Sequence, residues 1–403
     1  MLEGRSPSLA TKHYESSFSQ RFSRIVIMTA IAIIPARGGS KGIPRKSLRP
    51  VAGKPMIFYA IHAALNAPSV NRVVVSTDDE EIAMLAERFG ADVISRPSFL
   101  AADDVPLDPV VLAASESAEK LYSERYDYIV TVQPTSPLVA SADIETAIAM
   151  LRRDSSADTV LSVVDDRHLT WRIEDGRPVP AYQARVNRQQ IPATYRETGA
   201  VIACTASQLK QGTRIGKNIL LLELPAERSF DIDSIPDLLV CEQILRQKKI
   251  AFVVTGYAEV GLGHAYRTIM LANELVQHKL KFFCDSKSDL AARYIAEFNY
   301  PVSVTNSLMK DLADFQPDLV INDILDTGLD YIESLRTLGC KIVNFEDLGP
   351  GHMAADLVIN ALYSESQDQP PHVRSGVRYF CLRDEFLYTQ PSIFRPKIEQ
   401  ILI

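Results

Sequence analysis

The sequence of 403 residues has few cysteines, no long apolar run and no excess of positive charge. Its five cysteines are odd in number, lie far apart and contain no CxxC pair, which argues against a disulfide framework or a zinc site and favours a reducing compartment. No segment approaches the roughly 20 apolar residues that cross a bilayer. A net charge of -7 argues against a broad nucleic-acid-binding face. We therefore predict a cytoplasmic protein that binds neither membrane nor nucleic acid.

Residues 1–28 are polar and rich in serine, and they lack the apolar segment of a secretory signal. We interpret them as a flexible leader outside the fold, with Met28 as a possible alternative start.

From Ile31 onward, short β-rich segments alternate with amphipathic helical segments. This alternation predicts an α/β fold with a doubly wound, mostly parallel, Rossmann-like sheet. The pattern breaks over residues 165–190, a polar stretch around Trp171 that we expect to project from the sheet. At Lys249 an apolar strand, a glycine loop and a helix start the same pattern again. We predict two domains, 29–248 and 249–403. The expected strands of the first are 31–34, 72–76, 127–132, 159–164 and 199–204, and its expected helices are 55–66, 80–89, 109–120, 141–153 and 236–248.

The segment "IAIIPARGGSKGIPRKSLRP" places a glycine loop and five cations directly after a buried strand. Glycines let backbone N–H groups turn toward an anion, and arginine and lysine side chains bind phosphate. The loop lacks the spacing of a Walker A motif and of GxGxxG. A solvated basic loop is the alternative, but its position at the carboxyl end of a strand favours an anion site.

A pair of acids in "SFDIDSIPDL", Asp231 and Asp233, stands two residues apart. On a strand, such residues point to the same side. Two neighbouring carboxylates suit Mg²⁺, which takes one or two carboxylates together with substrate phosphates. In the alternative interpretation, Asp233 caps the helix that follows.

The glycine loop "IPARGGSKGIPRKSL" resembles the signature of the N-acylneuraminate cytidylyltransferases, the enzymes that make CMP-sialic acids. The resemblance continues through "VVVSTDDEEIAMLAERFGADVISRP", "QPTSPL", "NRQQIPATYRETGAVIA" and "SFDIDSIPDL" and covers residues 31–248. It implies a nucleotidyltransferase fold and Mg²⁺-dependent transfer of CMP from CTP to the anomeric hydroxyl of a nine-carbon 2-keto sugar acid, with release of pyrophosphate. It leaves open whether that nonulosonic acid is of sialic, legionaminic or pseudaminic type.

The resemblance also implies roles for individual residues. The phosphates would contact Arg37, Lys41 and Lys46, and the nucleotide would lie along Gly38, Gly39 and Ser40. Asp231 and Asp233 would bind the metal, and one of them would take the proton of the attacking hydroxyl. Further substrate contacts are expected from Ser47, Arg96, Gln133, Arg188 and Arg196. The segment near Trp171 would contact a second copy, which implies a homodimer. Ser47 stands where the family more often has asparagine, and "SFLAADDVPLDP" follows Arg96 where the family more often has a run of Thr and Ser.

The second half opens with "GYAEVGLGHAYRTIMLANEL", which resembles the N-terminal lobe of a GT-B UDP-sugar hydrolase of pseudaminic acid synthesis. In that family the loop histidine, here His264, is the candidate base that activates water. Residues 398–403 are expected to form the first strand of a further α/β unit. Since GT-B enzymes bind UDP chiefly through the second lobe, we expect no independent UDP-sugar hydrolysis by this chain. The alternatives to the cytidylyltransferase are a UDP-sugar hydrolase and a non-catalytic nucleotide-sugar-binding protein.

Overall fold

The computed structural model describes residues 28–39, 42–382, 386 and 388. The chain forms two compact units that divide between Asp237 and Leu238, whereas the sequence predicts a boundary after Lys248. The predicted leader, apart from Met28, lies outside the described residues, as do Ser40, Lys41 and the strand expected at 398–403.

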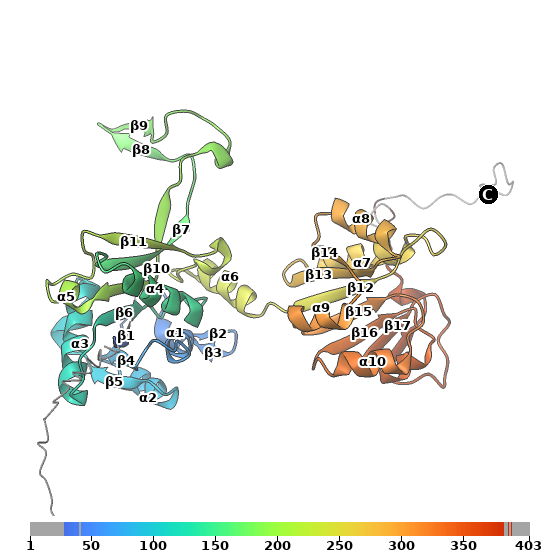
Figure 1. Ribbon diagram of the computed structural model, residues 1–403, viewed down its shortest axis with the longest axis horizontal. Helices are drawn as coiled ribbons and strands as arrows, with labels where there is room; N and C mark the ends of the chain where they lie inside the picture. The colour runs from blue at the N-terminus through green and yellow to red at the C-terminus, as the bar shows by residue number, and fades with distance from the viewer. Residues whose placement is uncertain (1–27, 40–41, 383–385, 387, 389–403) are drawn as a thin grey trace, which may run out of the picture. The chain divides into compact units, whose positions relative to one another are not determined.

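The first unit contains a mixed sheet with the strand order β11-β7-β10-β6-β1-β4-β5 (Figure 1). Neighbouring strands are parallel except at β10, which runs antiparallel to β6 and β7. The strands are β1 Ala30–Pro35, β4 Arg72–Thr77, β5 Asp92–Ser95, β6 Tyr128–Val132, β7 Thr159–Asp165, β10 Tyr195–Thr205 and β11 Ile219–Glu223.

Every residue of β1 is buried, and its side chains alternate between the two faces of the sheet. Both faces therefore carry apolar side chains that helices must cover. Ala32 and Ile34 pack into one core with α1 (Met56–Leu65), α2 (Glu80–Arg88) and α4 (Ser141–Arg153). Ile31 and Ile33 pack into the other core with α3 (Leu107–Tyr122) and α5 (Ala206–Leu209). The predicted doubly wound α/β sheet is confirmed.

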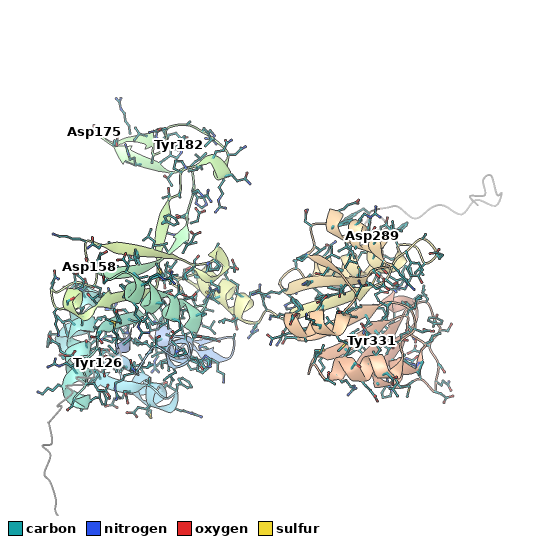
Figure 2. All side chains as sticks on the ribbon, in the orientation of Figure 1. Tyr126, Asp158, Asp175, Tyr182, Asp289 and Tyr331 are labelled. Carbon is teal, nitrogen blue, oxygen red and sulfur yellow. The ribbon has the colours of Figure 1, made fainter. Side chains whose placement is uncertain are left out.

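A hairpin stands away from the sheet between β7 and β10 (Figure 1). It consists of β8 (Trp171–Glu174) and β9 (Arg177–Pro180), and Trp171 pairs with Pro180. Trp171 makes an edge contact with Tyr182, which Figure 2 labels beside the hairpin. The expected projection of this polar segment is confirmed.

The remaining short elements connect the larger ones. They are η1 (Lys46–Leu48), β2 (Pro50–Val51), β3 (Lys54–Pro55), η2 (Ser98–Leu100), η3 (Arg188–Gln190), η4 (Ala226–Arg228) and α6 (Ile235–Leu245).

The second unit contains a parallel sheet with the order β14-β13-β12-β15-β16-β17-β18. Its strands are β12 Lys249–Val254, β13 Lys279–Asp285, β14 Val302–Thr305, β15 Leu319–Asp323, β16 Lys341–Phe345, β17 Leu357–Asn360 and β18 Val373–Ser375. Helices α7 (Gly263–Glu274) and α8 (Asp289–Glu297) share one core, and α9 (Leu308–Phe315) and α10 (Leu329–Arg336) share the other. Successive strands are added toward one edge of the sheet up to β14 and toward the other edge from β15 onward. The point between β12 and β15 is therefore a topological switch point, where open α/β folds bind ligands. Short segments η5 (Pro350–Ala354) and η6 (Val377–Tyr379) complete the unit.

Among the described residues, no helix combines the length and the apolar character needed to cross a bilayer.

Candidate active site

A cavity of about 380 Å³, which we call the loop cavity, opens where β1 and β6 end. Several residues predicted from the sequence for the site line this cavity, whereas Gly38 and Gly39 do not. Its lining comprises Arg37, Lys46, Ser47, Arg96, Gln133, Asp231 and Asp233, together with Pro35, Gly42, Leu107, Pro134 and Thr135.

Two glycines of the loop lie too close to neighbouring groups for any side chain. A Cβ at Gly38 would lie 2.7 Å from Asp79 Oδ2, and the Gly38 N–H donates to Asp78 Oδ1 over 3.1 Å. A Cβ at Gly42 would lie 2.9 Å from the backbone oxygen of Asp233. The glycine loop therefore packs directly on the acidic segment, although the two are far apart in the sequence.

Two of the cations that line the loop cavity are paired with acids. Arg37 Nη1 lies 2.8 Å from Asp103 Oδ1, and Lys46 Nζ lies 2.8 Å from Asp233 Oδ1. These two pairs hold Arg37 and Lys46 at the wall of the cavity, where a bound anion can contact both cations.

Arg96 is held differently, because its side chain is buried and donates from Nη2 to the Ser76 backbone oxygen over 2.7 Å. Burial lowers the pKa of Arg96, the charge of Asp78 opposes that shift, and the charge of Arg37 adds to it. A second anionic group near Arg96 and Arg37 would relieve this repulsion.

The acid pair lies in a loop before α6 and not on a strand, so the strand argument for a shared side does not apply to it. The N–H of Ile232 donates to the Thr135 backbone oxygen over 2.8 Å instead of joining a ladder. Ile232 is fully buried, and the two aspartates on either side of it still line the same cavities.

The helix-cap interpretation of Asp233 is also wrong. The carboxylate of Asp237 accepts hydrogen bonds from the backbone N–H groups of Asp233 and Ser234, at 3.2 and 2.8 Å. The carboxylate of Asp233 pairs with Lys46 instead.

Asp231 differs from Asp233 in its surroundings. Its Oδ1 atom is buried and has no hydrogen-bond partner among the described residues. Burial raises the pKa of Asp231, the Thr135 hydroxyl opposes that shift, and the neighbouring charge of Asp233 adds to it. An unpartnered buried carboxylate oxygen is costly unless a cation or a hydrogen-bond donor reaches it.

A second cavity of about 700 Å³, which we call the acceptor cavity, adjoins the acid pair. Both predicted arginines of "NRQQIPATYRETG" line it, and Arg196 Nε lies 3.7 Å from Asp166 Oδ2. Asp231 and Asp233 belong to this lining as well as to that of the loop cavity. The two cavities therefore meet at the acid pair. The other lining residues are Val164, Asp165, Asp166, His168, Arg188, Glu197, Thr198, Gly199, Ala226, Ser229, Phe230 and Asp237.

Gln133 is positioned by a glycine on the antiparallel strand. Gly199 has a φ of +71°, and a Cβ there would lie 2.9 Å from Gln133 Nε2. The pairing of β10 with β7 is irregular between Glu197 and Ile202. Glycine at this irregularity makes room for the amide of Gln133 beside the loop cavity.

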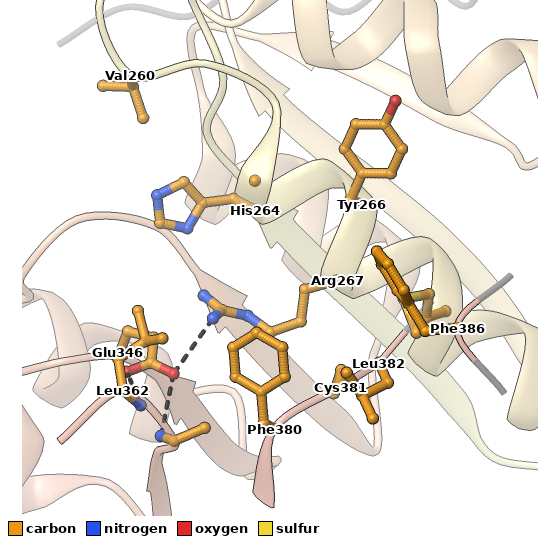
Figure 3. A pocket seen from close by; sticks show the side chains of 13 residues that line it. Val260, His264, Tyr266, Arg267, Glu346, Leu362, Phe380, Cys381, Leu382 and Phe386 are labelled. Atoms are coloured by element: carbon orange, nitrogen blue, oxygen red, sulfur yellow. Dashed lines mark hydrogen bonds and ion pairs between the residues drawn. The ribbon is translucent and has the colours of Figure 1, made fainter. Parts of the chain in front are cut away.

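The second unit has its own polar cluster, in which residues of α7 meet Asp323 at the end of β15. Figure 3 shows three residues near this cluster, His264, Arg267 and Glu346, on the wall of a pocket. His264 Nδ1 lies 2.6 Å from Asp323 Oδ1, and Arg267 donates to both oxygens of Asp323 over 2.6 Å. Arg267 also contacts Glu346 at 3.2 Å. Burial alone would lower the pKa of Arg267, but hydrogen bonding and the charge of Asp323 raise it above its ordinary value.

This arrangement determines how His264 is oriented. Asp323 accepts two bonds from Arg267 and offers only acceptor atoms, so Nδ1 of His264 donates to it. His264 lines a cavity of about 540 Å³ with Arg267, Glu346 and apolar residues that include Phe380 and Leu382. The other ring nitrogen, Nε2, takes no part in the bond to Asp323.

Comparisons with known proteins concern the first unit. Residues 31–202 match the sequence profile of a family described as Cytidylyltransferase. Within the first unit, residues 31–202 are therefore similar to the cytidylyltransferases.

Two relatives show how far this similarity extends. Post-translational flagellin modification protein B of Campylobacter coli is 29% identical over 226 residues, which is 55% of this chain and 96% of that protein. The N-acylneuraminate cytidylyltransferase of Escherichia coli O18:K1:H7 (strain RS218 / NMEC) is 31% identical over 228 residues, 54% of this chain and 52% of that enzyme. The chain thus spans about half the length of the second relative. A solved CMP:2-keto-3-deoxy-manno-octonic acid synthetase in complex with CTP is 19% identical, covers 54% of this chain and 98% of its own, and has a TM-score of 0.41.

These matches support the predicted similarity of the first unit to cytidylyltransferases, whereas the restriction to N-acylneuraminate as acceptor stays a prediction. The similarity of the second half to a UDP-sugar hydrolase stays a prediction. Sequence reasoning missed Asp103, Asp166 and Asp323. Asp323 ends "PDLVIND", and a polar residue at the carboxyl end of a parallel strand was the available signal. Asp103 and Asp166 lie in polar stretches that carry no such signal.

Proposed function

We propose that the first unit transfers CMP from CTP to the anomeric hydroxyl of a nine-carbon 2-keto sugar acid of sialic, legionaminic or pseudaminic type, and releases pyrophosphate. The observation that carries this proposal is the shared wall of the two cavities. Asp231 and Asp233 line both, with cations on one side and the guanidinium groups of Arg188 and Arg196 on the other. This arrangement suits a reaction that joins a triphosphate to a second anionic substrate. The dispersed cysteines favour the cytoplasm as its setting.

Magnesium fits the acid pair. The described residues contain no cluster of three or more His, Cys, Asp or Glu side chains that could hold a metal alone. Mg²⁺ usually takes one or two carboxylates and completes its shell with phosphates and water. The buried, unpartnered Oδ1 of Asp231 and the exposed carboxylate of Asp233 provide such a pair. When bound, the ion would polarise a phosphate oxygen and neutralise charge.

The protein's own groups would position and neutralise the reactants. Arg37 and Lys46 would exchange their acid partners for phosphate oxygens and stabilise negative charge on the leaving pyrophosphate. Arg196 and Arg188 would hold the carboxylate of the sugar acid. The anomeric oxygen then forms a bond to the α-phosphorus, the bond from that phosphorus to the bridging oxygen breaks, and the hydroxyl proton passes to Asp231 or Asp233.

We further propose that the enzyme is a homodimer held in part by the β8–β9 hairpin. Trp171 and Ile173 are 57% and 70% exposed. Apolar side chains on a projecting two-stranded element are unfavourable unless another surface covers them.

The test is CMP-sugar formation by the purified chain, with CTP, Mg²⁺ and a panel of nonulosonic acids. Asp233→Ala is expected to lower the rate by about 100-fold or more, because it removes a carboxylate that would bind Mg²⁺ or take the hydroxyl proton, and loss of general-base catalysis alone costs about this much. Glu227→Gln, an exposed acid outside both cavities, is the matched control and is expected to keep the wild-type rate. Unchanged CMP-sugar formation by Asp233→Ala would contradict the proposed site.

A second candidate function belongs to the second unit and rests on the His264–Asp323 pair. A histidine oriented by a buried carboxylate suits a general base that activates water, as a UDP-sugar hydrolase requires. The same reactions, supplied with a UDP-diacetamido sugar, report UDP release. Release that is lost in His264→Asn would support this function, and absence of release would support the expectation drawn from the sequence.

A further inference from the structure

Arg37 links the loop cavity to the segment between β5 and α3. Its Nη1 atom lies 2.8 Å from Asp103 Oδ1 and donates to the Ala102 backbone oxygen over 3.3 Å. Both groups lie between η2 and α3, in a segment that ends at Leu107, a residue of the cavity wall. One guanidinium is therefore held by two neighbouring acceptors.

Arg37 and Lys46 each pair with an acid, and these two acids differ in their position relative to the cavities. Asp233, the partner of Lys46, lines both cavities and belongs to the acid pair. Asp103, the partner of Arg37, lines neither cavity, and its side chain is 47% exposed. A phosphate that binds Arg37 would therefore break the Arg37–Asp103 pair without displacing a member of the acid pair.

The proximity of Arg96 to Arg37 gives a further reason for Asp103 to neutralise the charge of Arg37. Arg37 and Arg96 both line the loop cavity, and the charge of Arg37 acts on Arg96. Without a nucleotide, two neighbouring cations repel each other, and a carboxylate on the more exposed one reduces this cost. Arg37 is 32% exposed, whereas Arg96 is buried and fixed by the Ser76 oxygen.

We infer that Asp103 is a positioning residue that occupies, on Arg37, the place of a phosphate until the nucleotide binds. This inference rests on the proposed function, because it takes the triphosphate of CTP as the anion that replaces Asp103. The carboxylate keeps the guanidinium extended over the cavity. It also competes with the phosphates, so that binding and release of the nucleotide exchange one charge-assisted hydrogen bond for another.

The sign of the effect distinguishes this role from a structural one. Removing the charge of Asp103 while keeping its shape, in Asp103→Asn, removes the competitor and is expected to tighten binding of CTP and of pyrophosphate. Exposed ion pairs contribute about 0.2–1 kcal/mol, which corresponds to about 1.5- to 5-fold in affinity. If Asp103 served only to hold its segment in place, the same substitution would weaken binding or leave it unchanged.

The experiment is calorimetric titration of the full chain with MgCTP and, separately, with magnesium pyrophosphate. Asp104→Asn is the matched control, because it makes the same change of charge one residue away, and Asp104 has no ion pair among the residues that the structure describes. We expect Asp103→Asn to bind both ligands about 1.5- to 5-fold more tightly than Asp104→Asn. In turnover, we expect a lower KM for CTP and no increase in kcat.

Equal or weaker binding by Asp103→Asn than by Asp104→Asn would overturn the inference. Failure of the proposed function gives a different result, namely no CMP-sugar from the wild-type chain with any acceptor. The pyrophosphate titration does not depend on turnover, so it still tests Asp103 in that case. If the wild-type chain binds neither ligand, the inference is also overturned.

Discussion

Arg72, at the start of β4, connects separate parts of the first unit. It donates hydrogen bonds to Glu124 at 2.9 and 2.7 Å and pairs with Asp92, and its guanidinium lies 3.7 Å from the ring centre of Tyr122. The hydrogen bonds from Arg72 lower the pKa of Glu124 to about 2, and a bond from Tyr126 adds to this shift. At the residue scale, the charge of Glu124 is thus linked to folding.

Glu124→Gln is expected to lower the stability of the first unit at neutral pH. A carboxylate with a lowered pKa contributes stability that is fully present above its unfolded pKa, near 4.5, and is lost as the pH falls toward about 2. The side chain is 40% exposed, so solvent screening limits the effect to about 1 kcal/mol or less. Urea unfolding of variant and wild type at pH 7, 4 and 3 should show a difference that shrinks with acidification.

Glu116→Gln serves as the control for this series, because Glu116 is an exposed acid of α3. Its stability should follow that of the wild type at every pH. A constant deficit of Glu124→Gln from pH 7 to pH 3 would show that its charge is not the cause.

At the scale of elements, the β8–β9 hairpin is the part of the first unit with least support from the core. All of β8 is exposed, and in β9 only Val179 is partly covered. A hairpin of this size is marginal in water without another surface. Its position between β7 and β10, two strands of the main sheet, nevertheless ties its base to the acceptor cavity, whose wall includes Asp165 and Arg196.

Ile173→Lys is expected to convert a dimer to monomer, because it places a charge on a surface that we propose is covered by a second copy. Light scattering after size exclusion measures the mass directly. Met84→Lys, at a position of α2 that is 65% exposed, is the matched control and should leave the mass unchanged. A wild-type chain that is monomeric at micromolar concentration, or an Ile173→Lys variant that stays dimeric, would contradict the assignment of the hairpin to the interface.

At the scale of the whole molecule, each unit has its own cores on the two faces of its own sheet. We therefore expect two thermal unfolding transitions. MgCTP at about 100 times its dissociation constant should stabilise the first unit by about 2.7 kcal/mol and raise its transition alone.

Phe282→Ala provides the reciprocal perturbation. Phe282 is fully buried and stacks on Phe252 with ring centres 4.7 Å apart. Its truncation should cost the second unit about 3–5 kcal/mol and lower only its transition in differential scanning calorimetry. A single transition that shifts as a whole with either MgCTP or Phe282→Ala would show that the units unfold together.

Much of the fold could be predicted because periodicity reports burial. The apolar run around Ile31–Ile34 matches a strand that is buried on both faces, and the predicted helix 141–153 coincides with α4. The site was predicted less completely. Arg37, Lys46, Arg96, Gln133, Asp231 and Asp233 do gather around one cavity. Their ion pairs, however, join residues far apart in the sequence, and spacing along the chain carries no information about such partners.

The alternation of strands and helices, the glycine loop and the acid pair can all be recognised in the local sequence, because they depend on side-chain size, charge and backbone freedom within a few residues. The contacts of the acids, in contrast, depend on which distant groups the fold brings to them. The Ile232 N–H bonds to the Thr135 oxygen, so the acid pair lies in a loop, and Asp237 rather than Asp233 binds the N–H groups before α6. Hydrogen bonds and charges act over a few ångströms in space, and folding alone determines which groups come that close.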